Sequence, residues 1–165
     1  MGADLSNKTH FVLAWGRVRV RWGMSESVEI AGGTFASREG KSAIEEGLGF
    51  APKFDADGLM PAMAVDADTG QPLMLAYMNE ESLRMTLALR QAVYWSRSRK
   101  EIWHKGRTSG EFQDVIEMLV DCDQDALVLR VKQRGGGCCH TKRATCFYRR
   151  VALGAGEGVV RLEGA

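Results

Sequence analysis

Three of the four cysteines in this 165-residue chain lie between residues 138 and 146. Cys139 and Cys146 are seven residues apart around the polar stretch HTKRAT, which can fold back so that both thiolates reach one soft cation. With Cys122 they make three candidate zinc ligands. Three protein ligands around tetrahedral Zn²⁺ leave the fourth position for water, which is typical of a catalytic site. A fourth ligand from Cys138 or His140 would instead close the site.

Cysteines also serve three other common roles. A lone cysteine is most often a small buried hydrophobic residue, and Cys122 would be interpreted in this way if it were considered without the other cysteines. A redox dithiol is disfavoured because the spacing is not Cys-x-x-Cys and no thioredoxin-like pattern surrounds it. A secreted disulfide scaffold is disfavoured because basic residues follow the short apolar run of FVLAWGRVRVRW, unlike a signal peptide. The crowding of the cysteines therefore favours a metal.

Three alternating aspartates, Asp121, Asp123 and Asp125, surround Cys122. If this segment is extended, the three carboxylates lie on one face and Cys122 on the other. The carboxylates then repel one another unless they face open water or gather a hard cation, and Mg²⁺ is the usual intracellular partner of carboxylate oxygens. We therefore expect a magnesium site at the aspartates, with a solvated acidic strand end as the alternative.

A second group of candidate residues is basic and aromatic. Arginine offers bidentate donors to phosphate, hydroxyl groups add further donors, and tryptophan can stack on a base. In the SRSR stretch, alternation sends the arginines to one face of a strand and the serines to the other, so both reach one ligand only near a twist or loop. The pattern indicates a phosphorylated nucleotide site, against the alternative of a solvated basic hairpin. The residues expected to bind the nucleotide are Arg97, Arg99, Trp103, Lys105, Thr108 and Ser109.

The elements around these residues indicate a β-rich α+β fold in a single domain with short helices. The apolar stretches LMPAMAVDA and PLMLAYM flank the turn Asp68-Thr69-Gly70 and predict a hairpin of two buried strands. Further strands are expected over AVYWSRSR, VIEMLVDCDQDALVLRVKQ and CFYRRVAL.

Two helices are expected. Asn79 should cap a helix over about residues 80–90, with acidic residues in its first turn, a basic residue in its last, and Leu83 and Leu87 on one face. Residues 42–45 have the spacing of a capping box, which predicts a second short helix reaching residue 48.

The bulk composition limits the classes of protein that fit. A chain of 165 residues suits one domain that buries a core without disulfides. The 22 Lys and Arg residues nearly balance the 21 Asp and Glu residues, so no global field recruits nucleic acid or an anionic membrane. The apolar run near the N-terminus is too short, and too interrupted by arginines, to span a bilayer. We expect a cytoplasmic protein.

The described motifs are similar to those of the phosphoribosyl-AMP cyclohydrolase family, over about residues 54–151. The matching stretches are DGLMPAMAVDADTGQPLMLAYMN, VYWSRSRKEIWHKGRTSG, DCDQDAL and CCHTKRATCFYR. The resemblance implies one zinc per subunit at the three candidate thiolates and magnesium at the three aspartates. It also implies an intertwined homodimer with the zinc site shared between subunits, Cys122 coming from the partner chain. Two departures are Cys138, where a small uncharged residue is usual, and Lys142, where a glycine is common.

The resemblance implies a hydrolase of histidine biosynthesis. It would open the adenine ring of 1-(5-phosphoribosyl)-AMP at the N1–C6 bond with zinc-activated water, giving the phosphoribosylformimino-AICAR phosphate intermediate. His140 is the candidate proton shuttle for the departing nitrogen, or only a support for the metal loop. The rival interpretation is a structural-zinc RNA-binding module, which is weakened because the aspartates repel a phosphate backbone unless magnesium intervenes.

The first 23 residues carry a strand-like alternation at Val18, Val20 and Trp22. No motif lies within them, and termini are often disordered, so we interpret them as a disordered extension or a start-site artefact. We expect a monofunctional enzyme. Its further divisions are a lead-in over residues 24–53, the cyclohydrolase domain over 54–151 and a C-terminal tail over 152–165.

Overall fold

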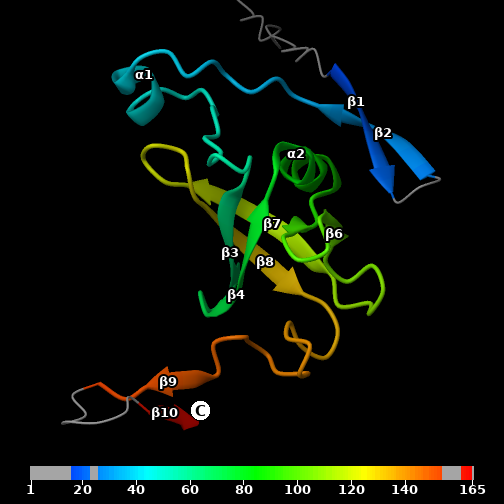
Figure 1. The fold of residues 1–165 in the computed structure, drawn as a ribbon, viewed down its shortest axis with the longest axis vertical. Helices are drawn as coiled ribbons and strands as arrows, with labels where there is room; N and C mark the ends of the chain where they lie inside the picture. The colour runs from blue at the N-terminus through cyan, green and yellow to red at the C-terminus, as the bar shows by residue number, and fades with distance from the viewer. Residues whose placement is uncertain (1–15, 23–25, 154–160, 165) are drawn as a thin grey trace, which may run out of the picture.

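The computed structural model of the chain describes residues 16–22, 26–153 and 161–164 (Figure 1). Its main element is a six-stranded sheet with the strand order β6-β5-β4-β3-β8-β7. In that order the strands are β6 (Glu101–His104), β5 (Val93–Ser96), β4 (Pro72–Met78), β3 (Met60–Asp66), β8 (Leu127–Gln133) and β7 (Gln113–Val120).

The remaining elements are short helices and two small strand pairs. They are α1 (Lys41–Glu45), α2 (Glu80–Leu89), the antiparallel pair β1 (Gly16–Trp22) and β2 (Glu26–Gly32), and the antiparallel pair β9 (Arg149–Val151) and β10 (Leu162–Gly164). The α+β prediction, β-rich with short helices, is therefore confirmed. Among the described residues, no helix is both long and apolar enough to cross a membrane.

Strands β3 and β4 form the predicted hairpin. Its turn is closed by the Asp66 carboxylate, which accepts hydrogen bonds from the backbone and the hydroxyl of Thr69 at 2.8 and 2.9 Å. Gly70 then takes a φ of 73°, which a glycine adopts without steric cost. On its other side β3 pairs in parallel with β8, so these two strands form the buried centre of the sheet. Ala62, Ala64 and Leu129 are fully buried there.

Helix α2 begins as predicted and ends earlier. Asn79 caps it, and the basic residue expected in its last turn, Arg90, is instead the left-handed C-cap with a φ of 52°. Leu83 and Leu87 lie four residues apart on one face of the helix, as expected, but Leu83 is fully buried whereas Leu87 is 43% exposed. The buried face turns toward β5, where the Thr86 hydroxyl accepts a hydrogen bond from the Val93 amide at 3.0 Å.

Three other boundaries differ from the sequence patterns. Helix α1 begins at Lys41 after Gly40, so Ser42 lies inside the first turn and the expected capping box is absent. The helix ends at Glu45 and does not reach residue 48 as expected. The stretch CFYRRVAL is strand only over β9. The alternation near the N-terminus is strand β1, whereas residues 1–15 of the proposed extension lie outside the described residues.

The cap of α2 gives a direct test of the local fold. Asn79 and Ser82 form a reciprocal capping box, with both side chains accepting a backbone N–H at 2.9 Å. Replacing Asn79 by alanine should lower the free energy of unfolding by about 1 kcal/mol, because the Ser82 amide loses its partner. Urea denaturation would measure the change. Asn79→Asp keeps a side-chain acceptor and should cost far less, and equal losses in the two variants would contradict the capping role.

Candidate active site

A cavity of about 350 Å³ lies between the segment 103–111, which begins in β6, and the loop 138–146, which follows β8. The two segments are far apart in sequence, and the sheet brings them together. The cavity gathers six of the residues predicted from the sequence to bind substrate, bind zinc or transfer a proton. They are Trp103, Lys105, Thr108, Ser109, His140 and Cys146.

The two predicted arginines do not line this cavity. Strand β5 ends at Ser96, so Arg97 and Arg99 lie in the following turn and strand alternation does not place them. The Arg97 guanidinium lies 3.8 Å from the centre of the Tyr77 ring. Arg99 donates a hydrogen bond to the Glu101 carboxylate at 2.6 Å. The lysines that line the cavity are Lys105 and Lys142.

Lys105 forms a fixed part of the cavity wall. Its residue is only 5% exposed, and its ammonium donates to the carbonyl of Glu111 at 3.2 Å. The next residue, Gly106, has a φ of 91° and lies against the backbone of Glu111 and Phe112, so the chain folds back on itself closely. A lysine buried in this way keeps its charge directed at the cavity with little side-chain freedom left to lose.

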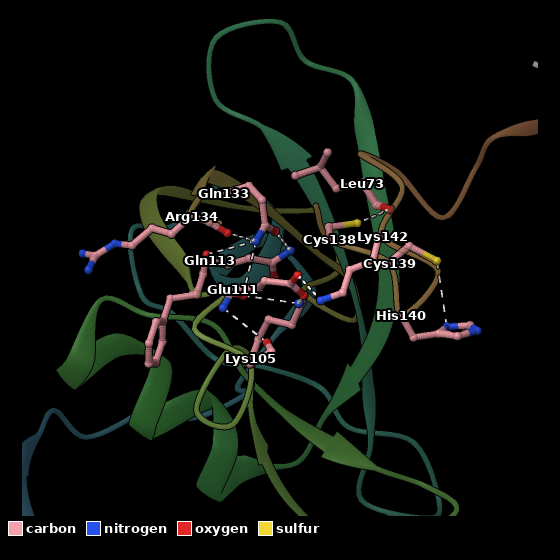
Figure 2. Close-up of polar contacts among 12 residues, drawn as sticks. Leu73, Lys105, Glu111, Gln113, Gln133, Arg134, Cys138, Cys139, His140 and Lys142 are labelled. Carbon is pink, nitrogen blue, oxygen red and sulfur yellow. Dashed lines mark hydrogen bonds and ion pairs between the residues drawn. The ribbon is translucent and has the colours of Figure 1, made fainter. Parts of the chain in front are cut away.

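Glu111 is a cavity residue that the sequence patterns did not reveal. It is buried, and its carboxylate accepts a hydrogen bond from the Lys142 ammonium at 2.9 Å across the cavity (Figure 2). That hydrogen bond is the main reason why the pKa of Glu111 is lowered. The available signal was its position as the sole acidic residue between Glu101 and Asp114, directly after the basic stretch.

The side-chain amides of Gln113, which is fully buried, and Gln133, which is half-buried, hold the Glu111 segment in place (Figure 2). The Tyr94 hydroxyl donates to Gln113 at 2.8 Å, and the Gln113 amide donates to Gln133 at 3.1 Å. Gln133 then donates to the carbonyls of Glu111 and Phe112, both at 3.2 Å. Burial raises the pKa of Tyr94, which therefore stays a neutral donor. A satisfied buried network of this kind makes the wall rigid.

The loop 138–146, called the cysteine loop below, brings together three thiols that lie in different environments. Cys138 is buried, and its thiol donates to the Leu73 carbonyl at 3.1 Å (Figure 2). The Thr141 hydroxyl donates to the Cys139 sulfur at 3.0 Å, which lowers the pKa of Cys139. Burial and the neighbouring sulfurs of Cys138 and Cys139 raise the pKa of Cys146 to about 12. A cation near these sulfurs would relieve that repulsion.

Cys122 lies elsewhere in the same chain. It belongs to the turn before β8, whereas the cysteine loop follows β8, and Figure 1 shows the two segments beyond opposite ends of that strand. Seven extended residues separate the ends by roughly 20 Å. Cys122 lines a second cavity, of about 390 Å³, with residues 44, 45 and 47–50 of the lead-in segment. One chain therefore does not bring Cys122 to Cys139 and Cys146.

The three aspartates converge, but by a different geometry from the one expected. Strand β7 ends at Val120, so Asp121, Asp123 and Asp125 lie in a turn and the prediction of an extended segment is wrong. A carboxylate oxygen from each lies within 4.8 Å of the other two. The ammonium of Lys53 contacts Asp123 and Asp125, both at 2.9 Å. These hydrogen bonds raise the pKa of Lys53, and the one to Asp123 lowers the pKa of that carboxyl.

Gln124 fixes the aspartate turn from inside. It takes a φ of 62°, and its buried side chain accepts a hydrogen bond from the Ala51 amide at 2.7 Å and donates to the Ile44 carbonyl at 2.9 Å. The turn is thus attached to the lead-in segment more than 70 residues away. No sequence pattern among the aspartates signalled this role.

The fold and the cavity define a class of protein. A β-rich domain in which a thiol-bearing loop faces a wall with a buried lysine and an aromatic residue has the features of a small-molecule enzyme. Comparison of the sequence with known protein families supports an enzyme. The sequence pattern of the family described as phosphoribosyl-AMP cyclohydrolase matches residues 74–148.

Relatives with that description are similar over most of their length. The phosphoribosyl-AMP cyclohydrolase of Brucella anthropi is 54% identical over 126 residues, which cover 76% of this chain and 89% of the relative. The enzyme of the same description from Nitrobacter winogradskyi is 55% identical over 118 residues, covering 72% of this chain and 81% of the relative. The chain therefore belongs to the phosphoribosyl-AMP cyclohydrolase family. The enzyme class and the place in histidine biosynthesis expected from the motifs are confirmed.

The cavity wall offers a matched pair of glycines for a test. A Cβ on Gly106 would overlap the backbone of Glu111 and Phe112, whereas a Cβ on Gly110, with a φ of 78°, would meet no atom within 4 Å. Gly106→Ala should lower the free energy of unfolding by about 3 kcal/mol or more and abolish turnover. Gly110→Ala adds only backbone strain of about 1–2 kcal/mol. Chemical denaturation and turnover assays would compare them, and equal effects would show that close packing at Gly106 is unimportant.

Proposed function

We propose that this chain hydrolyses the N1–C6 bond of 1-(5-phosphoribosyl)-AMP, giving the phosphoribosylformimino-AICAR phosphate intermediate, and that the 350 Å³ cavity is the substrate site. The observation that carries the proposal is the convergence of the cysteine loop and the lysine-bearing wall on one cavity, in a member of this family. Hydrolysis adds a water oxygen to C6 and a proton to N1. The site must therefore hold the purine, lower the pKa of a water molecule and supply a proton to N1.

Cys139 and Cys146 are the proposed zinc ligands from this chain. Two observations support a soft cation here. The Thr141 hydroxyl favours the thiolate of Cys139, and a cation would offset the burial and the neighbouring sulfurs that raise the pKa of Cys146. Cys138 fits less well, because its buried thiol already donates a hydrogen bond to the Leu73 carbonyl. When bound, zinc would supply Lewis acidity, which lowers the pKa of water from 15.7 to about 7.

The third ligand is proposed to be the partner subunit's Cys122 in a homodimer. The length of β8 keeps this chain's own Cys122 away from the cysteine loop, so a shared site is the arrangement that unites the three thiolates. Exposed apolar side chains on the edge strand β7 support a partner there: Ile116 and Leu119 are 62% and 47% exposed, and Val120 is 41% exposed. Exposed apolar side chains gathered on an edge strand are typical of an interaction surface.

The remaining cavity residues have proposed roles in binding and proton transfer. Trp103 packs on Tyr94, with ring centres 5.6 Å apart, and offers an aromatic surface for the purine. Lys105, Thr108 and Ser109 supply donors to phosphate and ribose. His140 is exposed at the cavity, with its Nδ1 3.9 Å from the Cys139 sulfur, and is proposed to protonate N1 as the bond to C6 breaks.

Asp121, Asp123 and Asp125 are the proposed magnesium ligands. Their oxygens are close enough to share one cation, and carboxylates suit hard cations. The ammonium of Lys53 already contacts two of them, so a bound magnesium ion would have to displace it. Lys53 and magnesium would thus compete for the carboxylates of Asp123 and Asp125.

The shared zinc site is tested by mixing inactive chains. Cys122→Ser, Cys139→Ser and Cys146→Ser should each lose zinc and turnover, whereas Cys138→Ser should keep zinc. After subunit exchange, Cys122→Ser mixed with Cys139→Ser should recover about a quarter of wild-type turnover, since half of randomly formed dimers are mixed and each has one complete site. Metal analysis and turnover would be measured together. No recovery after verified exchange would place all three ligands in one chain.

The magnesium site is tested by removing its competing lysine. Lys53→Met should tighten binding of Mn²⁺, a spectroscopic substitute for Mg²⁺, by about threefold, the effect of an exposed ion pair. Asp123→Asn should weaken Mn²⁺ binding and leave zinc content unchanged. Electron paramagnetic resonance would measure free Mn²⁺. Lys41→Met, which removes a lysine paired 3.6 Å from Glu45 on α1, is the control. Equal affinities in the two lysine variants would rule out the competition.

A further inference from the structure

Lys142 has a backbone conformation that does not suit a lysine. Its φ is 62°, in the left-handed region that residues with a Cβ rarely adopt, within a turn closed by a 2.9 Å hydrogen bond from its amide to the Cys139 carbonyl. Glycine would fit this turn without strain. The turn geometry therefore does not account for a lysine at this position.

The side chain of Lys142 crosses the cavity to an acidic residue that has another cation beside it. The Lys142 ammonium lies 2.9 Å from a Glu111 carboxylate oxygen, and the Lys105 ammonium lies 4.0 Å from the other (Figure 2). The Glu111 side chain is only 10% exposed. If Lys142 moves away, Lys105 still lies beside the buried carboxylate, so the charge is not left unpaired.

The two lysines differ in their freedom to move. The Lys142 side chain is 71% exposed, whereas that of Lys105 is 6% exposed. An ion pair held by an exposed, flexible lysine is screened by solvent and is exchanged for another anion more easily than a pair between two buried groups. A phosphate group carries more charge than a carboxylate and offers more acceptor oxygens, so it competes well for an ammonium at the cavity.

We propose that Lys142 is a phosphate-binding residue that exchanges Glu111 for a substrate phosphate when the nucleotide binds. This inference rests on the proposed function of the cavity. The substrate carries two phosphates, and Lys105 and Lys142 are the two lysines that line the described cavity. Lys142 would thus contribute to specificity for a doubly phosphorylated nucleotide without taking part in bond breaking.

A structural role for the same ion pair makes a different prediction. If Lys142 and Glu111 only tie the cysteine loop to the opposite wall, removing either partner should have the same effect. If Lys142 exchanges partners, the two changes should differ in sign. Glu111→Gln removes a competitor and a negative charge near the phosphate, whereas Lys142→Gln removes the phosphate ligand itself.

The test compares KM and kcat for 1-(5-phosphoribosyl)-AMP in the two variants. Lys142→Gln should raise KM about tenfold and leave kcat within about twofold, and Lys142→Arg should restore most of the affinity because it keeps the charge. Glu111→Gln should leave KM unchanged or lower it. An unchanged KM in Lys142→Gln, a rise of KM in both variants, or a fall in kcat that follows zinc content would overturn the exchange.

Phosphate-bearing inhibitors give an independent readout. Lys142→Gln should weaken inhibition by AMP or by ribose 5-phosphate about tenfold and leave inhibition by adenosine unchanged, and a uniform change would overturn the proposal. Lys105→Met, checked for folding by circular dichroism, distinguishes failure of the exchange from failure of the cavity assignment. If it raises KM and Lys142→Gln does not, the cavity assignment stands and the exchange is wrong. If neither variant changes KM, the cavity is not the substrate site.

Discussion

Strand β8 is the constraint on which the proposed site depends. It pairs in parallel with β3 and antiparallel with β7, and Leu127, Leu129 and Val131 on one face are almost completely buried. A strand held on both edges and packed on one face cannot shorten or swing, so the aspartate turn and the cysteine loop stay at its two ends. A catalytic centre that needs groups from both ends is therefore incomplete in one chain, and the obvious way to complete it is a second copy.

Exposed lysines balance both acidic groups near the proposed sites. Lys53 contacts Asp123 and Asp125, and Lys142 contacts Glu111. Each of these two lysine side chains is at least 47% exposed, so solvent screens its ion pair. When Lys142 departs, Lys105 still lies 4.0 Å from the buried Glu111 carboxylate. In the proposed function, the same arrangement would let each lysine give way, to a cation at one end of β8 and to a phosphate at the other.

The sequence patterns correctly predicted the features that depend on residues close together in the chain. The turn around Gly70 and the cap at Asn79 follow from residues within a few positions, and both are observed. The convergence of the aspartates was predicted for the wrong reason, because a buried Gln124 imposes a turn where alternation suggested a strand. Glu111 was missed because its role comes from a partner 31 residues away. Long-range pairing of this kind leaves no periodic pattern to detect.

The cysteine loop joins the proposed metal and phosphate functions in one turn. The Lys142 amide donates to the Cys139 carbonyl, and the Cys139 amide donates to the Arg143 carbonyl, so the backbone positions of Cys139 and Lys142 are not independent. In the proposed mechanism, zinc bound to Cys139 would fix the turn from which Lys142 reaches across the cavity. Metal binding would then set the position of a phosphate ligand as well as acidify water. Because linkage is reciprocal, bound nucleotide would in turn favour the loop geometry that holds the metal.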